Sequence, residues 1–202
     1  MTSLKNLEVE KLFDVIDSCG KAQASSLSKM LNEPLRHNLR AILQTGFYNI
    51  EEIIPKFVKQ EVCAIYVGCE GDLRLEILFF LDIKEARKLA SQMVGGRMQQ
   101  GLVGIAKSSI SEVGNIMAGT FLNALSSKTD LRIQASIPGL AIDFFEAVLE
   151  TPLARIVKTT DELIVIESEF RSVKERVVIR SIVILEPEGA RKILERINDD
   201  MM

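Results

Sequence analysis

The 202-residue chain has few of the residues that build metal or disulfide sites. Its single histidine, His37, lies on a segment that we expect to be a strand, with no second histidine and no cysteine nearby. Because protein-bound zinc usually has four nitrogen or sulfur ligands, this argues against a zinc site. The three cysteines, Cys19, Cys63 and Cys69, are odd in number and show no CxxC spacing, which predicts reduced thiols rather than a disulfide framework.

Long apolar runs and an excess of one charge are also missing. No apolar run approaches 18 residues, and the first ten residues hold no signal-peptide core, so we expect neither a membrane span nor a secretory leader. The net charge is −3, the pI is near 5.4, and the two signs of charge are mixed, which indicates neither nucleic acid nor an anionic membrane as a partner. These features predict a cytoplasmic globular protein.

What the chain does contain is the same order of elements twice. Each half has the pattern of a long helix, a strand, a short helix, an apolar hairpin and a last helix. Asp82 is the expected N-cap of the last helix in the first half, and a glycine-rich connection at 95–101 joins the halves. The expected elements are 6–31, 35–43, 48–57, 61–68 with 72–81 and 82–94, then 103–127, 131–138, 144–153, 162–170 with 176–186, and a helix from 187.

Neither half has enough strands to form a covered sheet alone. We therefore predict a single α/β (α+β) domain over 1–202, made of two pseudo-twofold halves at about 6–94 and 102–198. The halves would share one antiparallel sheet of about six strands, with the two long helices side by side on one face.

The second long helix carries a polar face opposite an apolar one. At 100° per residue, the apolar residues gather around Ile110, and the opposite pole holds small and polar residues. A glycine in mid-helix costs about 1 kcal/mol relative to alanine, so Gly119 on the polar side suggests that a partner approaches closely there. The apolar set is Ile110, Val113, Met117, Phe121, Ala124 and Leu125, and the polar set is Ser108, Glu112, Asn115, Gly119 and Asn123.

A four-point spacing, Ser-x3-Glu-x2-Asn-x22-Pro, joins Ser108, Glu112, Asn115 and Pro138. A Glu-x-x-Asn pair alone is common on solvated helices, but all four points should coincide by chance in roughly a few per thousand chains of this length. With the Gly-Asn-Ile-x-Ala-Gly core at 114–119 and the Asn-Ala-Leu that follows at 123–125, this spacing resembles the CheC/CheX/FliY family of chemotaxis phosphatases, its CheC branch in particular. The resemblance covers nearly the whole chain.

The resemblance implies hydrolysis of the aspartyl phosphate of the response regulator CheY. By position, Glu112 would form an ion pair with a lysine of the CheY active site, and Asn115 would orient the attacking water. Ser108, Gly119 and Pro138 would support the motif, Pro138 by ending the strand after the helix. The chain would need no cofactor or metal of its own, because CheY supplies Mg²⁺.

The first long helix departs from this pattern. Aligned with the second helix, it has Asp14 for Glu112, Asp17 for Asn115 and Lys21 for Gly119. Pro138 corresponds to Arg40, or to Ile42 if a small gap is allowed. Because an aspartate cannot donate a hydrogen bond and adds charge, we expect a degenerate site. Two carboxylates on an exposed helix are usually solvated, so we do not assign a metal to them.

Two other functions are compatible with the same resemblance. The chain could be mainly an adaptor that binds the receptor deamidase CheD, as CheC-like proteins do. It could also be a structural module like the middle domain of the flagellar switch protein FliM, which shares the fold and has no phosphatase motif. The intact pair of Glu112 and Asn115 argues against this last alternative.

Overall fold

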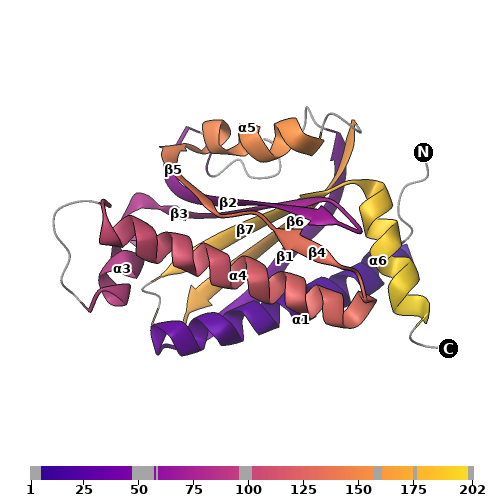
Figure 1. Ribbon diagram of the computed structural model, residues 1–202, viewed down its shortest axis with the longest axis horizontal. Coiled ribbons are helices and arrows are strands. Elements are labelled where there is room, and N and C mark those ends of the chain that lie inside the picture. The colour runs from indigo at the N-terminus through magenta and orange to yellow at the C-terminus, as the bar shows by residue number, and fades with distance from the viewer. Residues whose placement is uncertain are drawn as a thin grey trace.

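The computed structural model describes residues 6–46, 57, 59–95, 102–156, 161–174 and 177–199. These ranges contain five helices and seven strands (Figure 1). The elements are α1 (Asn6–Leu31), β1 (Leu35–Gly46), β2 (Glu61–Gly71), β3 (Leu75–Asp82), α3 (Ile83–Met93), α4 (Ile105–Thr129), β4 (Ile133–Ala135), β5 (Gly139–Phe144), α5 (Phe145–Ile156), β6 (Glu162–Ser172), β7 (Val178–Leu185) and α6 (Pro187–Asp199).

The strands form one antiparallel sheet in the order β1-β6-β7-β3-β2-β4, and β5 also pairs with β2. At its centre β3, from the first half of the chain, pairs with β7, from the second, so neither half forms the sheet alone. The predicted α+β fold with a shared sheet is confirmed, with seven strands instead of about six.

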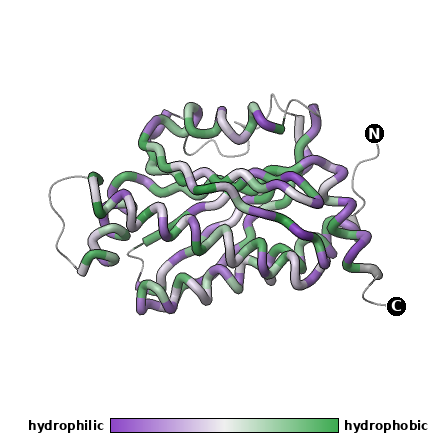
Figure 2. Tube along the Cα trace, viewed as in Figure 1, coloured by the Kyte–Doolittle hydropathy of each residue, from purple (hydrophilic) through white to green (hydrophobic). Residues whose placement is uncertain are grey.

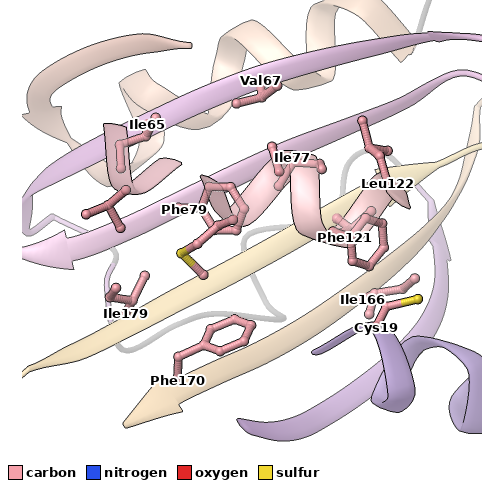
Figure 3. Close-up of a cluster of buried hydrophobic side chains, with 14 of the residues drawn as sticks. Cys19, Ile65, Val67, Ile77, Phe79, Phe121, Leu122, Ile166, Phe170 and Ile179 are labelled. Atoms are coloured by element: carbon pink, nitrogen blue, oxygen red, sulfur yellow. The ribbon is translucent and has the colours of Figure 1, made fainter. Parts of the chain in front are cut away.

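Two layers of helices cover the sheet. The helices α1 and α4 lie side by side on one face, and α5 covers the other (Figure 1). Hydrophobic and hydrophilic residues alternate along α1 and α4 (Figure 2), because one side of each helix packs on the sheet. Figure 3 shows the larger core, in which Phe121 from α4 and Cys19 from α1 approach the strands. A buried hydrogen bond from Gln23 Nε2 to the Met117 carbonyl oxygen, 3.0 Å long, joins the two helices.

The elements that reach the predicted site match the sequence pattern closely. Helix α1 has the expected bounds, and α4 begins and ends two residues later than expected. The apolar face of α4 is buried, with Ile110, Val113 and Met117 fully inaccessible. Asp82 caps α3 in a capping box with Glu85, as predicted. The orientation of α4 is therefore fixed by packing along its whole length.

The chain after α4 differs from the expectation. Strand β4 covers only Ile133–Ala135, and Pro138 lies in the loop before β5 instead of ending a strand at 138. Strand β5 was not predicted, although Leu140 and Ile142 alternate with exposed residues on the described chain. The helix expected at 48–57 and the connection at 95–101 lie outside the described residues, apart from Phe57 and Gly95. The division into two repeats stays a prediction.

Membrane and thiol features follow the composition. No described helix is long and apolar enough to cross a membrane. The cysteines Cys19, Cys63 and Cys69 are free and buried. Burial raises the pKa of Cys63 to about 11, so its thiol stays protonated at neutral pH and is a poor nucleophile.

Candidate functional site

A pocket of about 690 Å³ lies between α4 and the loop that joins β4 to β5. Its helix side carries three of the four residues of the spaced motif, and its loop side carries the fourth, Pro138. The structure thus brings the whole motif together across two elements. The residues that line the pocket are Lys107, Ser108, Ser111, Glu112, Asn115, Ala135, Ser136, Ile137, Pro138 and Leu140.

Glu112 and Asn115 present unengaged polar groups to this pocket. Both side chains are exposed, one helical turn apart on the polar face of α4. Neither makes a hydrogen bond or an ion pair with any other residue in the part of the chain that the structure describes. Since no internal partner holds them, their hydrogen-bonding capacity is available to a bound molecule.

Ser108 and Gly119 sit above and below this pair on the same helix. The Ser108 hydroxyl donates to the Gly104 carbonyl oxygen at 3.4 Å, a local bond in the first turn of α4. Gly119 does not line the pocket, but a Cβ placed on it would meet no atom within 4 Å. Packing inside the chain therefore does not require a glycine there.

The loop with Pro138 is anchored to the neighbouring strand β2. The Ser136 amide donates to the Gly68 carbonyl oxygen at 2.8 Å, and the Gly68 amide donates to Ser136 Oγ at 3.1 Å. These two bonds fix the backbone directly before Ile137 and Pro138. The loop wall of the pocket is held in place in this way.

A buried polar cluster explains why position 68 is a glycine. A Cβ on Gly68 would come within 2.9–3.1 Å of Tyr66 Oη, Arg155 Nη1 and Glu76 Oε2. The Tyr66 hydroxyl donates to Glu76 Oε2 at 2.5 Å, and Arg155 Nε lies 3.2 Å from Glu76 Oε1. Glu76 is fully buried, and desolvation raises its pKa despite the tyrosine hydrogen bond and the charge of Arg155, which lower it. The cluster surrounds Gly68, whose backbone holds Ser136, and it does not line the pocket.

The corresponding face of α1 is engaged internally. Asp14 is exposed, whereas Asp17 is half-buried and contacts two other side chains. Its Oδ2 lies 2.6 Å from Lys21 Nζ, and its Oδ1 lies 3.2 Å from Nδ1 of the fully buried His37 side chain. The expectation that both carboxylates are simply solvated is wrong for Asp17, because β1 places His37 against it.

His37 joins α1 to the sheet. Its Nε2 lies 3.1 Å from Ser168 Oγ on β6, and its ring fills the space where a Cβ on Gly20 would be. Burial lowers the pKa of His37, although the charge of Asp17 opposes this shift. A neutral imidazole therefore occupies the space beside Asp17.

The strand registers show which residues correspond in the two halves. On β1, His37 pairs with Phe170 and Ala41 pairs with Glu167. Between these two pairs β1 advances by four residues and its partner β6 by three. After α4, Ala135 pairs with Cys69 and Gly139 pairs with Tyr66. The chain again advances by four residues while its partner β2 advances by three. Arg40 therefore takes the place of Pro138 without a gap. The gapped alternative with Ile42 does not fit the register.

Comparison with known proteins agrees with this geometry. The CheC-like family matches residues 105–140, from the start of α4 through the loop with Pro138 into the first residues of β5. The CheY-P phosphatase CheC of Bacillus subtilis (strain 168) is 24% identical over 169 residues, which cover 79% of each chain. Thermotoga maritima FliY has the same fold, with a TM-score of 0.76 and 20% identity over 98% of this chain and 99% of that one.

The motif region, a curated relative and the fold are thus each similar to the CheC/CheX/FliY family. A further similar structure is the complex of CheX with CheY, BeF3 and Mg²⁺ from Borrelia burgdorferi. It matches with a TM-score of 0.57 and 19% identity over 86% of this chain and 99% of that one. At these identities the solved structures establish the fold of this chain, and its chemistry depends on its own residues.

Several residues that line the pocket were not predicted from the sequence. They come from the helix flank, at Lys107 and Ser111, and from the loop, at Ser136 and Ile137. Their common signal is position: each is within three residues of a motif residue. The described residues hold no group of three or more His, Cys, Asp or Glu side chains that could bind a metal ion.

Proposed function

We propose that this chain hydrolyses the aspartyl phosphate of the response regulator CheY. The observation that carries the proposal is the pocket in which Ser108, Glu112, Asn115 and Pro138 meet, although Pro138 comes from a different element. The similar proteins support it, since the relative from Bacillus subtilis is a CheY-P phosphatase and a CheX has been solved with CheY.

Asn115 is assigned the positioning of water. An aspartyl phosphate is an activated mixed anhydride, so placing water in line with the phosphorus accelerates its hydrolysis. The water oxygen bonds to phosphorus, the bond between phosphorus and the aspartyl oxygen breaks, and the aspartate leaves as a carboxylate. Both hydrogens of the water leave with the phosphate, as dihydrogen phosphate. An amide suits this step because it can donate to one oxygen and accept from another without adding negative charge.

Glu112 is assigned the docking of CheY. It lies one turn before Asn115, it is exposed, and no described residue forms an ion pair with it. A carboxylate here can pair with the lysine expected in the CheY active site and set the register of the complex. The Mg²⁺ that the reaction needs would be bound by CheY, and this chain would contribute no cofactor of its own.

The test is the decay of phosphorylated CheY with and without the chain. Asn115→Ala should abolish the acceleration while the helix content and melting temperature stay unchanged, because the side chain is exposed. Glu112→Ala should weaken complex formation and reduce the rate. Asn123→Ala is the matched control, since Asn123 is an exposed asparagine on the same helix outside the pocket. Full activity of Asn115→Ala would overturn the assignment.

The non-catalytic alternatives predict a different result. An adaptor for CheD, or a module like the FliM middle domain, would leave the decay of CheY phosphate unchanged at any concentration. The exposed and unpartnered pair of Glu112 and Asn115 favours catalysis, because a purely structural face gains nothing from an unengaged amide. Binding of CheD stays a prediction from the family resemblance.

A further inference from the structure

Ile137 is a large apolar residue that points into solvent beside the polar pair. It is 93% exposed, and it lines the same pocket as Glu112 and Asn115. Single exposed aliphatic residues are common on protein surfaces, so exposure alone would carry no meaning. Three further observations give this isoleucine a role.

First, the backbone holds Ile137 outward. The residue follows Ser136, whose amide and hydroxyl are both bound to the backbone of Gly68. A partly buried hydrogen bond between Tyr66 and Glu76 lies beside Gly68. An isoleucine on such a fixed loop loses little conformational freedom when a partner covers it.

Second, the corresponding residue of the first half is buried. By register, Leu39 on β1 takes the place of Ile137, and it is only 7% exposed. In the first half the strand continues through this position, with a register shift between Leu39 and Ala41. In the second half the strand is interrupted between Ala135 and Gly139, and the aliphatic side chain faces solvent.

Third, a second exposed isoleucine lies at the N-terminal end of α4, before the polar face. Ile105, the first residue of α4, is 76% exposed. It precedes Glu112 by seven residues, which places it within about 20° of the same direction on the helix. The polar pair is therefore flanked by Ile105 along the helix and by Ile137 across the pocket.

We propose that Ile137, assisted by Ile105, is the apolar docking contact for the phosphorylated receiver domain of CheY. The inference rests on the proposed function: a partner that brings a phosphoryl group to Asn115 enters the pocket that Ile137 lines and covers its side chain. Apolar contacts around a polar centre exclude water from it, as the rim of a protein interface does. Ile137 thus sets affinity for CheY, while Asn115 sets the rate of hydrolysis.

The test separates the Michaelis constant from the turnover number for phosphorylated CheY. Ile137→Ser should raise KM about tenfold, as expected for loss of one buried aliphatic side chain, and should leave kcat within twofold. Ile105→Ser should raise KM less, and Ile137→Leu should restore it. Leu7→Ser is the matched control, because Leu7 is 63% exposed at the corresponding position of α1 and should leave both constants unchanged.

Binding measured without turnover distinguishes the two proposals. In an Asn115→Ala background, titration of fluorescently labelled phosphorylated CheY should show weaker binding when Ile137→Ser is added. Unchanged binding and KM would overturn the docking role of Ile137 while leaving the phosphatase proposal intact. A change in the oligomeric state with unchanged KM would instead assign Ile137 to self-association and also overturn it. Absence of any CheY phosphatase activity in the unmodified chain would contradict both proposals.

Discussion

The polar faces of α1 and α4 occupy matching positions on the sheet but differ in what engages them. On α1, Asp17 contacts Lys21 at 2.6 Å and the buried His37 at 3.2 Å. On α4, Asn115 is exposed and makes no hydrogen bond with the described residues. The position that corresponds to Asn115 is thus engaged within the chain on α1 and is left open to an external substrate on α4.

The segments that follow the two helices, β1 after α1 and β4 with its loop after α4, also differ in how much space they leave beside the helix. His37 fills the space beside Asp17, and the smaller Ala135 takes its place beside the pocket. Arg40 lies in a strand that continues, whereas Pro138 lies in a loop that opens outward. The first half therefore differs from the second in its strand as much as in its helix. The following predictions test this comparison.

Among changes outside the pair of Glu112 and Asn115, the largest effect is expected when a lysine covers the face of α4, as Lys21 covers that of α1. Gly119→Lys places at position 119, one turn beyond Asn115, the residue type that α1 has at the corresponding Lys21. Because no atom lies within 4 Å of a Cβ here, the fold should tolerate the change, and helix propensity should stabilise it by up to about 1 kcal/mol. We expect phosphatase activity to fall about tenfold or more, since one docking contact of 1.4 kcal/mol corresponds to a factor of ten.

The control for this variant is Gly119→Ala, which adds only a methyl group and should keep most of the activity. Both variants should unfold at or above the temperature of the unmodified chain. If Gly119→Lys retains full activity, the bare backbone at this position is not needed for the approach of CheY.

A smaller effect concerns the pH dependence of stability. Burial lowers the pKa of His37, so the unfolded chain takes up a proton before the folded chain does. The stability contributed by the neutral imidazole is complete above pH 6.5 and is lost as the pH falls from 6.5 towards the lowered pKa. His37→Gln should flatten this part of the profile in denaturant unfolding between pH 7 and 5.

Asp17→Asn sharpens the same test. The charge of Asp17 favours protonated His37, so its removal should lower the pKa of His37 further and widen the pH range over which stability is lost. A profile that is identical in both variants and in the unmodified chain would mean that His37 is not the titrating group.

The smallest effect is expected from restoring the first site on the helix alone. Asp14→Glu, Asp17→Asn and Lys21→Gly, introduced together with Asn115→Ala, should give no measurable phosphatase activity, because His37 and Arg40 remain. Adding His37→Ala and Arg40→Pro should produce a small gain at most, since Leu39 continues the strand. Activity of the helix variant that approaches that of the natural site would contradict the role assigned to the strand.

The sequence was informative where packing and local chemistry agree. Helix α1, the capping box at Asp82 and the buried face of α4 were predicted because hydrophobic spacing and end signals coincide. The polar face with Glu112 and Asn115 was predicted for the same reason. Its assignment to a phosphatase came from the resemblance to a family.

The parts that were missed depend on pairing between distant segments. Strand β5 is short, and its alternation of Leu140 and Ile142 becomes meaningful only when β2 supplies the partner. The contact of His37 with Asp17 and the clamp of Ser136 on Gly68 join residues that are far apart or on different elements. No local pattern contains that information.

The most direct test measures the half-life of phosphorylated CheY in parallel with the unmodified chain, with Asn115→Ala and with Asp17→Ala. Asn115 and Asp17 hold corresponding places on the two helices, and catalysis is proposed for Asn115 alone. With Asn115→Ala we expect the half-life measured for phosphorylated CheY on its own, and with Asp17→Ala we expect the same shortened half-life as with the unmodified chain. Equal losses in both variants, with both folds intact, would contradict it.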